Sequence, residues 1–354
     1  MPSVSDSNYV FQQQEKCKKK CDEILNEMPQ YVSDFISEKL TGNTFQPRTA
    51  LSYLYDYKLF FEYLCEYHNE FKGLLPIEIN PELLKKVNEH DISKFLAHVR
   101  TYKKADKKYM NSEAGIKRKY ASISSLYEYM VKHKVLTSNP CKFIDPPRVH
   151  EHPITTLEQS EKKEFLEELE TCNTLSEKSK TIKENFTKYR DIAICYLFLG
   201  TGIRVSELVG INVSDIDFNT NSIVITRKGG NRVTVFFSDE VADELLIYME
   251  YSRPRMLPQE NSPDYDALFL SLHRKRISVR QVENVVKTAA TNIKNKNISC
   301  HKLRSTFGTN LYNATGDIYM TAEALGHKDV NTTRRHYAKN DRMREVPDYV
   351  KING

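Results

Sequence analysis

The sequence predicts a mainly α-helical protein of two domains, the second of which contains one small antiparallel sheet. Three observations support this fold class. Apolar residues recur at spacings of three and four residues through most of the 354-residue chain, as in helices that bury one face. Prolines gather over 140–153, where they interrupt the helical pattern. A two-residue alternation, typical of strands, runs over 222–237.

The first domain is expected to be a small helical bundle. Residues 23–67 are predicted to form two helices that are separated near Gly42. After a proline-containing loop, a further helix is expected with Asp91 as its N-cap, and another covers 116–131. Apolar residues fall on one face of these helices, and those faces are expected to form the core.

The proline-rich segment is interpreted as a linker, because proline lacks an amide donor and restricts the residue before it. Beyond it, helices are predicted over 157–171, 189–199 and 206–208. The segments 222–227 and 232–237 predict two strands, and Lys228-Gly229-Gly230-Asn231 between them suits a turn with positive φ. A β-hairpin is therefore expected, followed by helices from Asp239 onward.

The composition is that of a soluble globular protein, since 40% hydrophobic and 28% charged residues argue against a disordered chain. No apolar stretch is long enough to span a bilayer, and the N-terminus lacks the basic and apolar regions of a signal peptide. We therefore expect a cytoplasmic protein without membrane insertion. The seven cysteines are an odd number without C-x-x-C spacing, so neither a disulfide framework nor a zinc site is predicted.

Basic residues cluster between Arg100 and Lys119, although the net charge of +5 is modest. The cluster comprises Lys103, Lys104, Lys107, Lys108, Lys117 and Arg118. Such a density of positive charge is what the phosphate backbone of a nucleic acid attracts. A solvated loop followed by the start of a helix explains the same residues, and both interpretations remain open at this point.

An ordered series of motifs in the second domain carries the functional signal. It consists of Gly202-Ile203-Arg204-Val205-Ser206-Glu207-Leu208, the hairpin residue Lys228, His301-Lys302-Leu303-Arg304, Leu325-Gly326-His327 and Tyr337. Each residue alone has an ordinary explanation, such as a surface arginine or a charged turn residue. In this order the motifs resemble the tyrosine recombinase (phage integrase) family, and most closely Xer recombinases of the XerS type. The resemblance covers most of 23–338.

The resemblance implies a domain organisation. An N-terminal extension would cover 1–22, followed by a SAM-like helical core-binding domain that contacts DNA over 23–145 and by a linker over 146–154. A mixed α/β catalytic domain, mostly helical with a small antiparallel sheet, would cover 155–338. A C-terminal tail would remain at 339–354.

The resemblance also assigns roles to the motif residues. Tyr337 would be the nucleophile that attacks a DNA phosphate and forms a covalent 3′-phosphotyrosyl link. Lys228 would protonate the leaving 5′-oxygen. His301 is the candidate base for the tyrosine hydroxyl, and His327 would donate a hydrogen bond to the phosphate.

The chemistry of a phosphodiester explains why two arginines are needed. The group is anionic and gains charge on its non-bridging oxygens when it is attacked, which suits the paired donors of a guanidinium. Arg204 and Arg304 would form this clamp, and Glu207, one helical turn after Arg204, would orient it. With two arginines and Lys228 around the phosphate, no metal or other cofactor is expected. The phosphotyrosyl link keeps the energy of the broken bond, so rejoining would need no ATP.

The position of Tyr337 departs from the usual family pattern. In most relatives the nucleophile follows the histidine of Leu-Gly-His by nine residues, but here the ninth residue is His336 and Tyr337 is the tenth. Integrases of conjugative transposons include members with ten. Tyr319 and Tyr349 are the alternative nucleophiles, and Tyr337 is preferred.

The resemblance implies that both domains clamp double-stranded DNA. On the helix expected over 116–131, the candidate phosphate contacts are Lys117, Arg118 and Lys119. Recombination would require a homotetramer on two paired sites, in which the C-terminal segment docks into a neighbour through Met343, Val346 and Val350. A regulatory or directionality protein as a further partner is left open.

Three functions remain in competition. The first is a Xer-type recombinase that resolves chromosome dimers, and so acts in chromosome partition during cell division and the cell cycle. The second is an integrase or excisionase of a transposon or prophage, which the ten-residue spacing of Tyr337 favours. The third is a catalytically inactive DNA-binding protein, against which the ordered presence of all six catalytic side-chain types argues.

Overall fold

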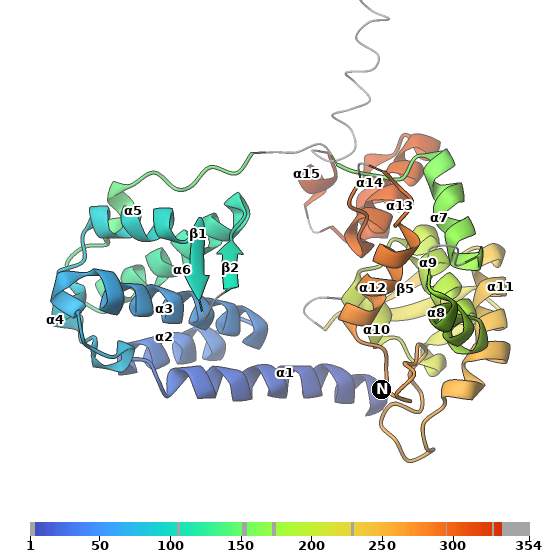
Figure 1. Cartoon of the computed structure of the whole chain (residues 1–354), viewed down its shortest axis with the longest axis horizontal. Coiled ribbons are helices and arrows are strands. Elements are labelled where there is room, and N and C mark those ends of the chain that lie inside the picture. Colours follow the sequence, from blue (N-terminus) through green and yellow to red (C-terminus); the bar gives the residue numbers. More distant parts are fainter. Residues whose placement is uncertain are drawn as a thin grey trace, which may run out of the picture. The chain divides into compact units, whose positions relative to one another are not determined.

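The computed structural model describes residues 4–104, 107–150, 154–171, 175–227, 230–294, 296–327 and 329–334 (Figure 1). The chain forms two compact units. One is Val10–His152, and the other consists of Met1–Tyr9 and Pro153–Gly354. Most of the described residues are helical, and the strands form two small antiparallel sheets. No described helix is both long enough and apolar enough to cross a membrane.

Helices dominate the unit Val10–His152. They are α1 (Val4–Leu25), whose first residues belong to the other unit, α2 (Gln30–Thr41), α3 (Pro47–Tyr67), α4 (Pro81–Leu84), α5 (Glu89–His98) and α6 (Glu113–Lys132). The predicted break near Gly42 is confirmed, since α2 ends at Thr41 with Gly42 as its C-cap. Fully buried aromatic rings fill much of the core, namely those of Phe35, Tyr57, Phe60, Phe61, Phe71, Phe95 and Tyr127.

The start of α5 differs from the expectation. Its N-cap is Asn88 and not Asp91, because the Asn88 side chain accepts hydrogen bonds from the amides of His90 and Asp91 at 2.8 and 3.2 Å. The Asp91 carboxylate in turn accepts from the Asn88 amide at 3.0 Å. Each side chain therefore accepts a hydrogen bond from the other residue's amide, as in a capping box with Asn88 at the N-cap and Asp91 at the third helical position.

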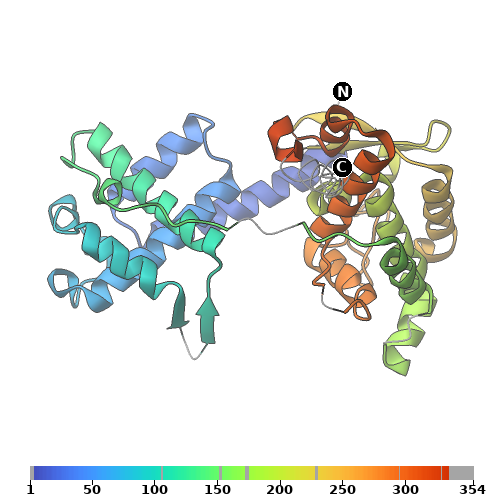
Figure 2. The same ribbon diagram turned by 90° about the horizontal axis from the view of Figure 1, so that it is seen from above.

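A second hairpin, which the sequence did not predict, follows α5. Strand β1 (Thr101–Lys104) pairs antiparallel with β2 (Lys107–Met110) and places Tyr102 opposite Tyr109. Their rings stack with centroids 5.3 Å apart. The two strands are the teal arrows of Figure 2 and extend beyond the helices of their unit. The basic cluster therefore begins on a hairpin, and its later part lies on α6.

The second unit contains nine described α-helices and a three-stranded sheet. Its helices are α7 (Gln159–Thr171), α8 (Glu177–Ile182), α9 (Lys188–Thr201), α10 (Val205–Gly210), α11 (Asp239–Ile247), α12 (Val279–Ala289), α13 (Cys300–Thr315), α14 (Ile318–Leu325) and α15 (Val330–Thr333). The sheet is ordered β3 (Ile216–Asp217), β4 (Ser222–Thr226) and β5 (Arg232–Phe236). The predicted hairpin is confirmed as β4 and β5, and β3 adds a short edge strand that was not predicted.

Helix α9 lies at the centre of this unit, because it is buried on nearly all sides. It ends at Gly202, whose φ of +62° is the left-handed conformation that favours glycine. A Cβ at this position would overlap the ring of Phe307 on α13. The close approach of the α9 terminus to α13 thus depends on Gly202, and it brings Arg204 beside α13.

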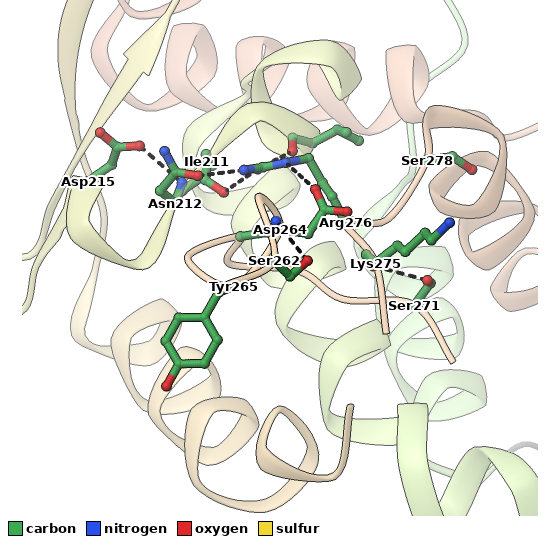
Figure 3. A network of polar contacts seen from close by, with 12 residues as sticks. Ile211, Asn212, Asp215, Ser262, Asp264, Tyr265, Ser271, Lys275, Arg276 and Ser278 are labelled. Carbon is green, nitrogen blue, oxygen red and sulfur yellow. Dashed lines mark hydrogen bonds and ion pairs between the residues drawn. The ribbon is translucent and has the colours of Figure 1, made fainter. Parts of the chain in front are cut away.

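A buried arginine fixes the other end of α10 (Figure 3). Arg276 donates to the carbonyls of Val209 and Ile211, both at 2.9 Å, and to the side-chain oxygen of Asn212 at 2.6 Å. Carbonyls at a helix C-terminus lack partners within the helix, and a cation there also complements the helix dipole. Arg276 therefore anchors the helix that presents Arg204 and Glu207.

Candidate active site

Arg204 is the N-cap residue of α10 and follows the left-handed turn at Gly202. Glu207, one turn later, accepts two hydrogen bonds from Arg204. One carboxylate oxygen accepts from the Arg204 amide at 2.7 Å, and the other from its Nη1 at 2.8 Å. The Glu207 side chain is buried, whereas 36% of the Arg204 side chain is exposed. The pair therefore presents a guanidinium toward solvent with its orientation fixed from behind.

Arg304 on α13 lies deeper, with 5% of its surface exposed. Its Nη1 donates to the carbonyl of Gly202 at 2.5 Å, and its Nη2 donates to the carbonyl of Leu325. One buried guanidinium therefore joins the turn before Arg204 to the end of α14.

The two histidines of the predicted site lie on either side of Arg304 in the sequence. His301 is one turn earlier on α13 and is exposed. His327 directly follows Gly326, the left-handed C-cap of α14. The His327 Nδ1 and the hydroxyl of buried Thr333 are 2.8 Å apart, which holds the ring in one orientation.

Arg227 is a further cation at this site that sequence reasoning missed. It follows β4 and directly precedes Lys228, and its Nη2 donates to the carbonyl of Ala324 at 3.2 Å. Burial lowers the pKa of Arg227, nearby Arg204 acts in the same direction, and Glu207 opposes both. The only signal in the sequence was its place beside the hairpin turn.

Three arginines from three elements therefore hold three successive carbonyls at the end of α14. Arg227 binds the carbonyl of Ala324, Arg304 that of Leu325, and Arg204 that of Gly326 at 3.4 Å. The C-terminal carbonyls of a helix carry partial negative charge and have no partners within the helix, so they offset the repulsion between the guanidiniums. This arrangement places His327 directly after a segment that is fixed on three sides.

Two of the predicted residues, Lys228 and Tyr337, lie outside the described residues. The hairpin is described up to both sides of Lys228. The Arg227 amide donates to the Asn231 carbonyl at 2.8 Å, and the Gly230 amide donates to the Arg227 carbonyl at 3.0 Å. Of the alternative nucleophiles, Tyr349 is also outside the description, and Tyr319 lies exposed in the first turn of α14.

The predicted DNA contacts on α6 belong to the other unit and differ in exposure. Lys117 and Arg118 are exposed, but Lys119 is buried. The Arg118 guanidinium and the Lys119 ammonium both contact the carboxylate of Asp56 on α3, at 2.9 and 3.2 Å. Burial raises the pKa of Asp56, and the two cations oppose this effect. Asp56 was not singled out in the sequence.

A known protein family and several known proteins are similar to this chain. Residues 157–344 match the profile described as the phage integrase family. The chain is similar to tyrosine recombinase XerC of Caldanaerobacter subterraneus, with 31% identity over 90% of this chain and 86% of the relative. It is 28% identical to tyrosine recombinase XerS of Streptococcus mutans, over 93% of this chain and 97% of the relative.

A solved structure confirms the fold class. The chain is similar to the XerH site-specific recombinase in a post-cleavage complex with a palindromic difH substrate. The TM-score is 0.62 at 19% identity, and the likeness covers 90% of this chain and 94% of that one. The predicted combination of a helical part and a mostly helical part with a small sheet is therefore that of known recombinases.

Proposed function

This chain belongs to the phage integrase family of tyrosine recombinases, and on that premise we propose that it cleaves and rejoins DNA at a specific site. The reaction would proceed through a 3′-phosphotyrosyl intermediate. The observation that carries the proposal is the convergence of Arg204, Arg304 and the segment before His327 through the hydrogen bonds of two guanidiniums. These residue types in one place form an anion-binding site that suits a phosphodiester.

In the first step the Tyr337 oxygen forms a bond to phosphorus while the bond to the 5′-oxygen breaks. His301 takes the tyrosine proton, and Lys228 gives a proton to the leaving oxygen. Arg204, Arg304 and His327 stabilise the charge on the non-bridging oxygens. Glu207 acts through Arg204, because it accepts one hydrogen bond from the Arg204 amide and one from its guanidinium. A 5′-hydroxyl from another strand then reverses the step and joins the new strand.

The finer proposal is resolution of chromosome dimers in a bacterial cytoplasm, as part of chromosome partition at cell division. It is supported by the relatives called XerC and XerS, which match this chain over nearly their whole length. The alternative is an integrase or excisionase of a transposon or prophage. The ten residues from His327 to Tyr337 favour this alternative.

The assembly is proposed to be a homotetramer on two paired duplex sites, with or without a regulatory protein. Residues 23–145 would form the core-binding domain, 146–154 the linker, and 155–338 the catalytic domain. Lys117 and Arg118 are proposed to contact phosphates directly. Lys119 would contribute by holding Asp56, and with it Arg118, in place.

The test is a cleavage assay on a nicked duplex that carries the chain's own site, identified by genomic footprinting. The protein is incubated with this duplex in the presence of a chelator, and a denaturing gel separates protein–DNA adducts. We expect an adduct for the wild type and for Tyr319→Phe, and none for Tyr337→Phe. An adduct that persists in Tyr337→Phe would move the nucleophile elsewhere. Specific binding without any adduct would favour the inactive DNA-binding protein.

A further inference from the structure

Of the three arginines that hold the end of α14, one has no place in the reaction described above. Arg204 and Arg304 are the phosphate clamp, whereas Arg227 belongs to the hairpin and is the residue immediately before Lys228. A charged side chain at this place needs an explanation, because burial lowers its pKa and Arg204 lowers it too, against the opposing effect of Glu207. A neutral side chain would avoid both effects.

The backbone of Arg227 is fixed within the hairpin. Its amide donates to Asn231 and its carbonyl accepts from Gly230, so Arg227 is the base of the turn that contains Lys228. Gly230 has a φ of +86°, which allows this tight closure. The described residues on the two sides of Lys228 are thus hydrogen-bonded to each other.

The side chain of Arg227 is fixed at a different place. Its Nη2 donates to the carbonyl of Ala324, and its guanidinium lies where a Cβ of residue 326 would otherwise be. Only a glycine at 326 leaves this space. The Arg227 Nε is buried and has no hydrogen-bond partner among the described residues, so the bond from Nη2 to Ala324 is the described hydrogen bond that holds this side chain. One side chain therefore links the hairpin to the segment that leads to His327.

We propose that Arg227 is a positioning residue, whose attachment to the Ala324 carbonyl sets where the hairpin delivers Lys228. The inference rests on the proposed function, in which the Lys228 ammonium gives its proton to the 5′-oxygen as the bond from phosphorus to that oxygen breaks. A general acid must be within hydrogen-bond reach of the leaving atom. Because Lys228 is the next residue, loss of the Arg227 side-chain bond removes the link between the base of this turn and the segment before His327.

The experiment separates this role from a general loss of structure by changing the leaving group. Two nicked duplexes with the same site are used, and one of them carries sulfur in place of the 5′-bridging oxygen at the cleaved bond. A thiolate leaves without being protonated, because its pKa is several units below that of an alcohol. A defect in proton delivery therefore disappears on the sulfur duplex, and a defect in phosphate binding does not.

The variants are Arg227→Met, which keeps the bulk without the donors, and Arg227→Lys, which keeps one cationic donor. We expect Arg227→Met to form the adduct roughly 10- to 100-fold more slowly than wild type on the ordinary duplex. On the sulfur duplex its rate should lie within about threefold of wild type. Arg227→Lys should be intermediate on the ordinary duplex. Lys228→Ala serves as the positive control for rescue by sulfur.

Arg232→Met is the matched control. Arg232 lies across from Thr226 on the neighbouring strand and pairs with Asp215 at 2.7 Å, on the sheet side of the unit. Its loss removes a guanidinium from the same hairpin, and we expect no difference between its effects on the two duplexes. Thermal unfolding of each variant identifies any that does not fold. If Arg227→Met fails to fold, the positioning role is tested by the ratio of the rates of Arg227→Lys on the two duplexes.

The outcomes distinguish a failure of the positioning role from a failure of the proposed function. Equal slowing of a folded Arg227 variant on both duplexes, or no slowing on either, overturns the positioning role and leaves the proposed function intact. A wild type that forms no adduct on either duplex overturns the proposed function and this inference with it. Selective slowing on the ordinary duplex, as for Lys228→Ala, supports the inference.

Discussion

Glu207 fixes the position of Arg204 through two hydrogen bonds. Its carboxylate is buried and accepts from both the amide and the guanidinium of Arg204. A buried carboxylate needs such partners, because an unpaired charge in a protein interior is costly. The same need keeps the arginine from adopting other rotamers, so the guanidinium is preorganised for the phosphate that we propose it binds.

Gly326 can be tested by comparison with Gly316, since both are left-handed C-caps with φ of +60° and +65°. A Cβ at Gly326 would overlap the Arg227 guanidinium, whereas a Cβ at Gly316 would have no neighbour within 4 Å. We expect either alanine substitution to cost about 1–2 kcal/mol of unfolding free energy through backbone strain. Gly326→Ala should cost roughly 1 kcal/mol more, because the flexible guanidinium gives way and its bond to Ala324 is lost.

Urea unfolding of a double-mutant cycle measures this prediction. In an Arg227→Ala background the bond to Ala324 is already absent, so Gly326→Ala should cost no more than Gly316→Ala. Equal costs for Gly326→Ala in both backgrounds would show that Arg227 and Gly326 are not coupled.

The contacts of a residue could be predicted from the sequence where its partner lies in the same motif. They could not be predicted where the partner lies far away in the sequence. Arg204 and Glu207 are neighbours on one short helix, so their contact follows from the helical repeat. Arg227 and Asp56 instead form their contacts with residues that lie 97 and 63 positions away. A charged residue at the end of a strand or on a helix gives no local sign of such partners.

At the scale of elements, one of the two hairpins could be predicted from the sequence and the other could not. Strands β4 and β5 were predicted, because Ile and Val alternate along them and a glycine-containing turn joins them. Strands β1 and β2 consist mostly of lysine and tyrosine, and the described part of β2 is exposed on every residue. Without an apolar face they carry no periodic signal, and the pairing of Tyr102 with Tyr109 is evident only in the structure.

Helix α6 gives a prediction that separates structural from DNA-binding cations. Lys119→Met removes a buried partner of Asp56 and should lower the unfolding free energy by about 2 kcal/mol. This is less than a buried pair that loses its only partner, because Arg118 still contacts Asp56. Lys117→Met, on the exposed face, should change stability by less than about 0.5 kcal/mol. Urea unfolding measures both, and equal effects would contradict the assignment.

At the scale of the whole molecule, each of the two units has a hydrophobic core of its own. The proposed anion-binding site with Arg204 and Arg304 belongs to one unit, and the exposed cations of α6 belong to the other. Chemistry and much of the non-specific attraction to DNA would thus be assigned to separate units. Under this proposal, DNA cleavage and the affinity for DNA can be changed independently by mutation.

Salt dependence of DNA binding tests that division. Each lysine or arginine that neutralises a phosphate contributes about 0.9 to the slope of log affinity against log salt concentration, because a counterion is released. Replacing Lys117 by Met should therefore reduce the slope by roughly 1 and weaken binding about equally for specific and random duplexes. Lys142→Met, on an exposed residue of the same unit that pairs with Glu128, is the control and should leave the slope unchanged. Adduct formation by Lys117→Met at saturating DNA should equal that of the wild type, since the residues that we propose to react belong to the other unit. An unchanged slope for Lys117→Met would exclude this face of α6 from the phosphate contacts.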